Sequence, residues 1–240
     1  MEDKNDQFTF EALIKDWQLN DNLEIKSTDD IDWQSTPKES NPEKPTALIN
    51  ALKNRISEFS KGKYDRVGII NDIDQSKSED LLATINNALK IAYPNEYKKI
   101  SQPNELVSFS FENTSTEEVY EVSFACYFVH LNQCGEIENL LKTAKEKDSE
   151  LADCIHQCSK ECLEQLRKED LKLKDKDLVK LWINNYIRYD TLPKKDRNAK
   201  NTTWETVMKE RQPKEQLFNF NHDVFKELKA FLTLMVKKEK

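Results

Sequence analysis

The chain has 240 residues, of which 37% are hydrophobic and 34% charged, and its formal net charge is −7. Its three glycines are too few to build the glycine-rich phosphate loops of P-loop and dinucleotide-binding proteins, which excludes both classes. The acidic balance argues against a protein whose whole surface binds nucleic acid by counterion release, although divalent cations or a local Lys/Arg patch could still admit a polyanion.

The first half of the chain alternates between helical and strand-like patterns. Apolar residues at helical spacing predict helices over 6–18, 48–59 and 81–92. Between the second and third of these, β-branched residues predict a short buried strand that ends at Asp72 and Asp74. This alternation indicates a parallel sheet with crossover helices.

The later segments add strands and then helices. Residues 107–111 and 119–131 are strand-like and are separated by a polar turn, which predicts a hairpin or strand pair that extends the sheet. Further helices are expected near these positions: 136–146, 150–168, 175–189 and 222–237. We therefore expect an α/β fold with a mostly parallel sheet flanked by helices. Its core would span 1–135, and a helical elaboration over 136–240 would complete the same domain.

Asp72 and Asp74 are separated by one residue at the carboxyl end of the predicted strand. On an extended backbone both side chains project to the same side, at the edge where open α/β sheets bind ligands. Two neighbouring carboxylates offer the hard oxygen ligands that suit Mg²⁺ or Mn²⁺. The other interpretation is that Asp after a strand forms a turn or caps a helix.

Glu2 and Asp6 form a second acidic pair at the start of the first predicted helix. Their four-residue separation places both on one face of the first helical turn. The alternative is a solvated terminal residue at Glu2 and an N-cap at Asp6.

The sequence E-D-K-N-D at the start of a helix, followed by a strand that ends D-I-D, resembles the order of acidic motifs in the Toprim domain. Toprim is the metal-binding fold of topoisomerases, bacterial primases and the overcoming-lysogenization-defect (OLD) nucleases. This resemblance implies that Glu2, Asp6, Asp72 and Asp74 bind divalent cations.

Two later segments resemble Toprim-like families of unassigned function that are related to the OLD nucleases. C-G-E-I-E-N-L-L at 134–141 is similar to their G-x-x-E-[DN]-L-L element, which implies Glu138 as an acidic ligand and Glu136 as a weaker one. D-K-D-L-V-K-L-W-I at 175–183 is similar to their D-K-x-x-V-x-x-W-[LI] helix, which implies Lys176 as the catalytic basic residue.

The resemblance implies metal-dependent phosphodiester hydrolysis of DNA or RNA with Mg²⁺ or Mn²⁺, in a setting such as phage defence. The family's first motif follows a hydrophobic strand and carries Gly after its Glu, whereas here Met1 precedes Glu2 and Asp3 stands in place of the Gly. These departures leave a second hypothesis open. In it, the chain is a catalytically degenerate binding or regulatory module that acts through a protein partner such as an ATPase.

The chain lacks a run of about 18 apolar residues and its N-terminus is polar, so we expect a cytoplasmic protein that does not bind membranes. Its five cysteines are then expected to be thiols. Three of them recur every fourth residue and predict the buried face of one helix rather than a zinc site, together with four neighbours. The cysteines are Cys154, Cys158 and Cys162, and the neighbours are Leu151, Ile155, Leu163 and Leu166.

Overall fold

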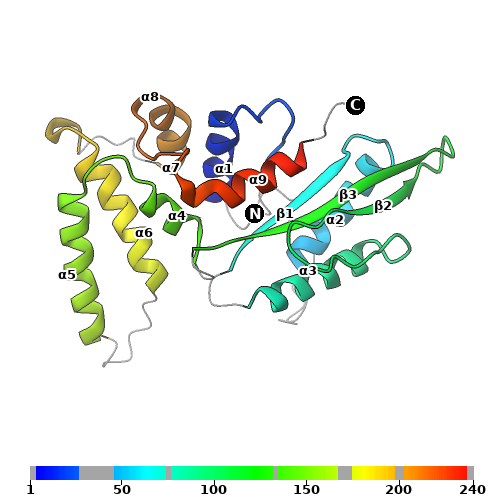
Figure 1. Cartoon of the computed structure of the whole chain (residues 1–240), viewed down its shortest axis with the longest axis horizontal. Coiled ribbons are helices and arrows are strands. Elements are labelled where there is room, and N and C mark those ends of the chain that lie inside the picture. The colour runs from blue at the N-terminus through cyan, green and yellow to red at the C-terminus, as the bar shows by residue number, and fades with distance from the viewer. Residues whose placement is uncertain are drawn as a thin grey trace. The chain divides into compact units, whose positions relative to one another are not determined.

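Figure 1 shows the computed structural model of the chain. It describes residues 4–26, 46–73, 77–131, 135–166, 175–197 and 203–236. The chain divides into two compact units. We call Met1–Val129 with Glu227–Lys240 the sheet unit, and His130–Lys226 the helical unit.

The sheet unit contains, within the described ranges, one sheet of three strands in the order β1-β3-β2. β1 (Arg66–Asp72) pairs in parallel with β3 (Val119–Val129), and β2 (Val107–Glu112) pairs antiparallel with β3. The expected α/β fold with helices flanking a sheet is confirmed. The sheet is not mostly parallel, because a turn as short as 113–118 can join only antiparallel neighbours.

One face of the sheet is covered by α2 (Thr46–Phe59) and α3 (Ser78–Ala92) (Figure 1). Alternate residues of the strands point to this face and meet both helices in a core rich in aromatic rings. The rings pack edge to face or tilted at centroid distances of 4.6–6.4 Å. They belong to Phe59, Tyr93, Phe109, Phe111 and Phe124.

The opposite face is covered by α1 (Lys4–Asp16) and α9 (Lys226–Met235) (Figure 1). Phe231 of α9 stacks on Tyr127 of β3 at 5.3 Å between ring centroids. Where α9 crosses β1 the strand has Gly68, and a Cβ there would lie 3.0 Å from Phe231 Cζ. Arg66 Nη1 donates to the carbonyl of Val236 at 2.9 Å, which ties the end of α9 to the start of β1.

The helical unit consists of helices and helical turns. Its longer helices are α4 (Ile137–Thr143), α5 (Glu150–Leu166) and α6 (Asp175–Asn185), which the sequence predicts. Its shorter pieces are π-helical turns at Tyr186–Asp190 and Val207–Arg211, 3₁₀ turns at Lys194–Asp196 and Asp223–Phe225, and the helices α7 (Trp204–Thr206) and α8 (Gln212–Glu215). The sequence pattern does not predict the helical stretch from Trp204 to Glu215, because it is broken into short pieces and contains a proline.

The predicted bounds, a core over 1–135 and a helical elaboration over 136–240, stay predictions. Of the two compact units, the sheet unit includes α9 apart from its first residue. That both parts complete one domain stays a prediction. No helix in the described parts of the chain has both the length and the apolar character needed to cross a membrane.

Candidate metal centre

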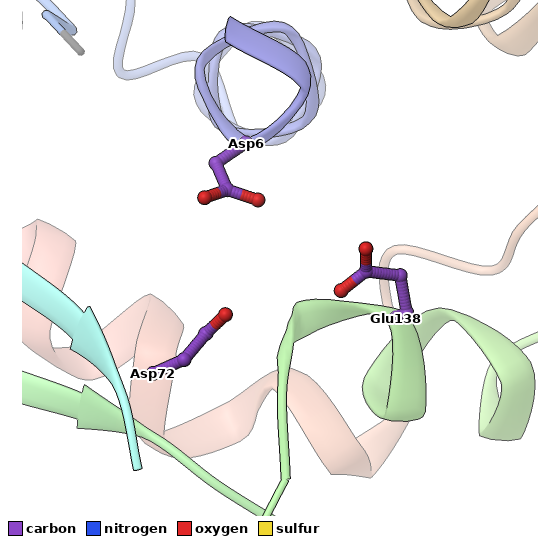
Figure 2. A group of neighbouring side chains, drawn as sticks. All are labelled: Asp6, Asp72 and Glu138. Atoms are coloured by element: carbon purple, nitrogen blue, oxygen red, sulfur yellow. The ribbon is translucent and has the colours of Figure 1, made fainter. Parts of the chain in front are cut away.

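Two acids of the sheet unit come together at the carboxyl end of β1. Asp6 lies in the first turn of α1, and Asp72 is the last residue of β1. A carboxylate oxygen of Asp6 and one of Asp72 lie within 4.8 Å of each other, and both residues are half-buried. Figure 2 shows the two carboxyl groups pointing toward one another from the helix and the strand. The structure thus brings together two acids that are far apart in the sequence.

Local structure fixes the direction of each acid. Asp72 pairs with Val129 in the β1–β3 register, and the next residue, Ile73, donates its amide to the Val129 carbonyl at 3.1 Å. Ile73 is only 5% exposed and packs in the core beneath α2 and α3. Because strand residues alternate, burial of Ile73 on that face directs Asp72 to the face covered by α1. The position of α1 is fixed by its own buried residues, Phe10, Leu13 and Ile14.

The chemistry of this pair fits a small divalent cation. Two ionised carboxylates at this separation repel each other, and a cation between them reverses that repulsion. Mg²⁺ takes oxygen ligands at about 2.0–2.1 Å and usually keeps several waters, so one or two carboxylates suffice to hold it. Asp6 and Asp72 therefore provide a donor set that suits hydrated Mg²⁺ or Mn²⁺.

Three of the predicted site residues have side chains outside the described part of the chain. Glu2 and Asp74 lie outside the described residues altogether. Lys176 falls in the first turn of α6, but its side chain also lies outside what the structure describes. The roles of all three stay predictions.

Glu138 belongs to the helical unit, where it lies in the first turn of α4 (Figure 2). Its Oε1 is 3.6 Å from Lys180 Nζ of α6, and the same ammonium is 3.5 Å from Oε2 of Glu136. Glu136 is 5% exposed, so this lysine compensates a buried carboxylate. The role of Glu138 as a third metal ligand stays a prediction.

Lys180 is the basic residue that sequence reasoning misses. It lies in the same D-K-D-L-V-K-L-W-I segment as Lys176, four positions later. Residues four apart share one face of a helix, so either lysine could be chosen from the spacing alone. The family motif favours Lys176, whereas the structure places Lys180 beside the two glutamates.

A buried tryptophan holds the helices that carry this ion pair. Trp182 of α6 stacks on Tyr186 with ring centroids 5.2 Å apart, and its Nε1 donates to Asp153 Oδ1 of α5 at 2.8 Å. Lys142 Nζ of α4 lies 5.3 Å above the Trp182 ring and 3.3 Å from His156 Nε2. Burial lowers the pKa of Lys142 and that of His156. Trp182 therefore contacts both neighbouring helices at once.

The predicted cysteine face of α5 is wrong. Cys154, Cys158 and Cys162 are exposed, and so is Leu151, whereas Ala152 is fully buried. Leu163 is buried as expected, at 2% exposure. The buried side of α5 thus follows the contact with α6, and the cysteines lie on the solvent side of it.

A fourth thiol lies in the sheet unit. Cys126 on β3 is fully buried in the aromatic core, where burial raises its pKa to about 12. It stays a neutral thiol and packs as a small apolar residue.

Fold and site define this molecule as an α/β protein with two converging carboxylates at the carboxyl end of β1. Residues 1–237 match the family described as Protein of unknown function (DUF3226), and the chain belongs to that family. No curated protein and no solved structure matches the sequence.

Proposed function

We propose that this chain is a Toprim-like, divalent-metal-dependent phosphodiesterase that acts on nucleic acid. The observation that carries the proposal is the approach of Asp6 and Asp72 to within 4.8 Å at the end of β1. It is supported by the matching order of acidic motifs in the sequence, which independently implies that both residues are metal ligands.

The proposal assigns roles to residues of this chain. Asp6 and Asp72 would hold Mg²⁺ or Mn²⁺, and the resemblance adds Glu2, Asp74 and Glu138 to the ligand set. When bound, such an ion supplies charge neutralisation for a phosphodiester and a more acidic water.

The chain's own contribution is positioning. The strand holds Asp72 in a fixed direction, because its neighbour Ile73 is buried in the core. Lys176 would place a positive charge near the substrate phosphate, which requires no Ser or Cys nucleophile.

A cleavage assay tests the activity. Single-stranded and duplex DNA and RNA are incubated with the protein and Mg²⁺ or Mn²⁺, beside Asp72→Asn, Asp6→Asn and Asp74→Ala. We expect at least ~100-fold slower cleavage in each variant, because a lost ligand removes transition-state charge stabilisation. The matched control is Glu112→Gln, an exposed acid at the end of β2, which should cleave at the wild-type rate. Cleavage undiminished in all three ligand variants would locate the activity elsewhere or trace it to a contaminant.

The second hypothesis is a binding or regulatory module, and the helical unit gives it one supporting observation. There Lys180 Nζ lies 3.5 Å from Glu136 and 3.6 Å from Glu138, so a cation of the chain itself contacts part of the predicted ligand set. Calorimetric titration with Mn²⁺ separates the two hypotheses. Mn²⁺ uptake that Asp72→Asn abolishes, without cleavage of any nucleic acid, would favour the module. No uptake at all would end the nuclease proposal.

A further inference from the structure

The sheet unit contains a cavity of about 340 Å³ that runs along β1 from its first residue to Ile70. It is lined by β1 residues from Arg66 to Ile70 and by the preceding Asp65. Neither Asp6 nor Asp72 lines it, so its lining does not include the candidate metal ligands of this unit. Its volume falls within the range of about 300–1,000 Å³ that is typical of small-molecule sites.

The cavity follows the open edge of β1. Within the described residues β1 pairs only with β3, so no described strand pairs with the backbone N–H and C=O groups of its other edge. Residues from both faces of β1 line the cavity, Val67 and Ile69 on the side of α2 and Gly68 and Ile70 on the side of α9. Gly68 contributes no side chain that would narrow this space.

The walls are apolar. α2 and α9 supply large aliphatic and aromatic side chains, and the segment 22–26 closes a further side. The main apolar lining residues are Leu23, Leu48, Leu52, Phe59, Phe231 and Met235. An apolar ligand body would be removed from water on several sides here.

The rim carries charged groups with a small positive surplus. Its cations are Lys26, Arg55, Lys63 and Arg66, and its acids are Glu24, Asp65 and the adjoining Glu58. Among the residues that the structure describes, four cations against three carboxylates leave one positive charge at the rim, in a chain whose net charge is −7.

Arg55 is the rim residue best placed to bind an anion. Arg55 Nη1 and Lys63 Nζ both contact Glu58, at 2.6 and 2.7 Å, so two cations share one carboxylate. A guanidinium has five N–H donors in a fixed plane, and the ion pair with Glu58 joins only Nη1. The remaining donors can serve a carboxylate that approaches over the cavity.

We propose that this cavity binds a small ligand with an apolar body and one anionic group, such as a medium-chain or aromatic carboxylate. The apolar body lies between α2, α9 and the edge of β1. The anionic group lies at the rim beside Arg55 and Lys63. The site needs neither the metal ion nor the nuclease activity.

A fluorescence titration with anilinonaphthalene sulfonate, an aromatic ring system with one anionic group, tests the site in the full chain. Decanoate should compete for the probe at least ~10-fold better than decanol, because a hydrogen bond from a guanidinium to a carboxylate is stronger than one to a neutral hydroxyl. Decylamine should compete no better than decanol. Arg55→Gln should remove most of the advantage of decanoate and leave competition by decanol unchanged.

Ala51→Phe fills the cavity from α2 and should weaken probe binding at least ~10-fold. Lys53→Gln is the matched control, since it lies on the same helix but does not line the cavity and is exposed. Near-ultraviolet circular dichroism shows whether Ala51→Phe keeps its native packing, and Arg55→Gln provides a second variant if it does not. Asp72→Asn should leave probe binding unchanged.

Several outcomes would overturn the proposal. One is that folded Ala51→Phe binds the probe as tightly as the wild-type protein. Another is that decylamine competes better than decanoate. If the probe binds only after deletion of residues 27–45, the occupant of the cavity would be that segment of the chain and not a separate ligand. Binding that falls as a dimer forms with rising protein concentration would assign it to a second copy.

Discussion

The two units hold their acids in different ways. In the sheet unit, Asp6 and Asp72 bring two carboxylates within 4.8 Å of each other at a strand end. In the helical unit, Glu136 and Glu138 face the ammonium of Lys180 at 3.5 and 3.6 Å. A divalent cation between the first two carboxylates would offset their mutual repulsion, whereas the second two already contact a lysine. The comparison is therefore between a pair of acids that suits a metal ion and a pair that contacts an ammonium group of the protein.

The largest effect is expected from removing the residue that positions the helical unit's ion pair. Trp182→Ala should lower the free energy of unfolding by about 3–5 kcal/mol, because it empties a fully buried site and removes the indole donor to Asp153. Urea denaturation followed by far-ultraviolet circular dichroism measures this. Leu181→Ala, an exposed neighbour on α6, should cost less than about 1 kcal/mol. Equal small losses in both variants would show that Trp182 does not anchor the helices.

In the sheet unit, the contribution of Asp6 and Asp72 to the free energy of unfolding should depend on a bound metal ion. At a concentration 100 times its Kd, Mn²⁺ should raise the free energy of unfolding by about 2.7 kcal/mol. Asp72→Asn should abolish this gain, and Glu112→Gln should keep it. The comparison between the two units fails if the gain persists in Asp72→Asn or disappears in Glu112→Gln.

The helical unit's acids should respond to loss of their lysine. Lys180→Met should destabilise the protein by about 1 kcal/mol, because Glu136 stays buried without its cation. Lys180→Arg, which keeps the positive charge, should retain most of the stability that Lys180→Met loses. A neutral effect of Lys180→Met on thermal unfolding would mean that these carboxylates need no compensation.

The smallest effect concerns pH. Burial is the largest cause of the lowered pKa of His156 in the folded chain. The charges of Lys142 and Lys160 also lower this pKa, and the carboxylate of Asp153 partly opposes them. The unfolded chain therefore binds a proton first as the pH falls below about 6.5, so stability is greatest above that pH and decreases below it. Melting temperatures between pH 7.5 and 5.5 should fall slightly. His156→Gln should flatten this dependence, and an identical slope in that variant would exclude His156 as its source.

Much of the sheet unit could be predicted because its signals are local. The apolar run that ends abruptly at Asp72 predicts β1, and the spacing of Phe10, Leu13 and Ile14 predicts the face that α1 buries. The approach of Asp6 to Asp72 could not be derived this way. It depends on how α1 packs on the sheet, and only the resemblance to Toprim motifs indicates it.

The prediction that the cysteines form the buried face of α5 failed for a geometric reason. Each four-residue step advances about 400° around a helix, so a stripe at this spacing drifts by roughly 40° per step. Cys154 lies roughly 160–180° around the helix axis from Ala152 and Leu163, and the drift brings Cys158 and Cys162 only part of the way toward their side. Ala152 and Leu163 mark the buried line instead. A single sequence shows neither which neighbour covers a helix nor how wide the covered stripe is.

The return of the chain from the helical unit into α9 affects how the protein can fold during synthesis. Phe231, Leu232 and Met235 fill the face of the sheet opposite α2 and α3, and they follow the entire helical unit in the sequence. Until a ribosome has released these residues, the part of that face that α9 covers stays open to water and to chaperones. The helical unit can form its own contacts before α9 is made. The sheet unit therefore begins to be synthesised first but completes its packing last.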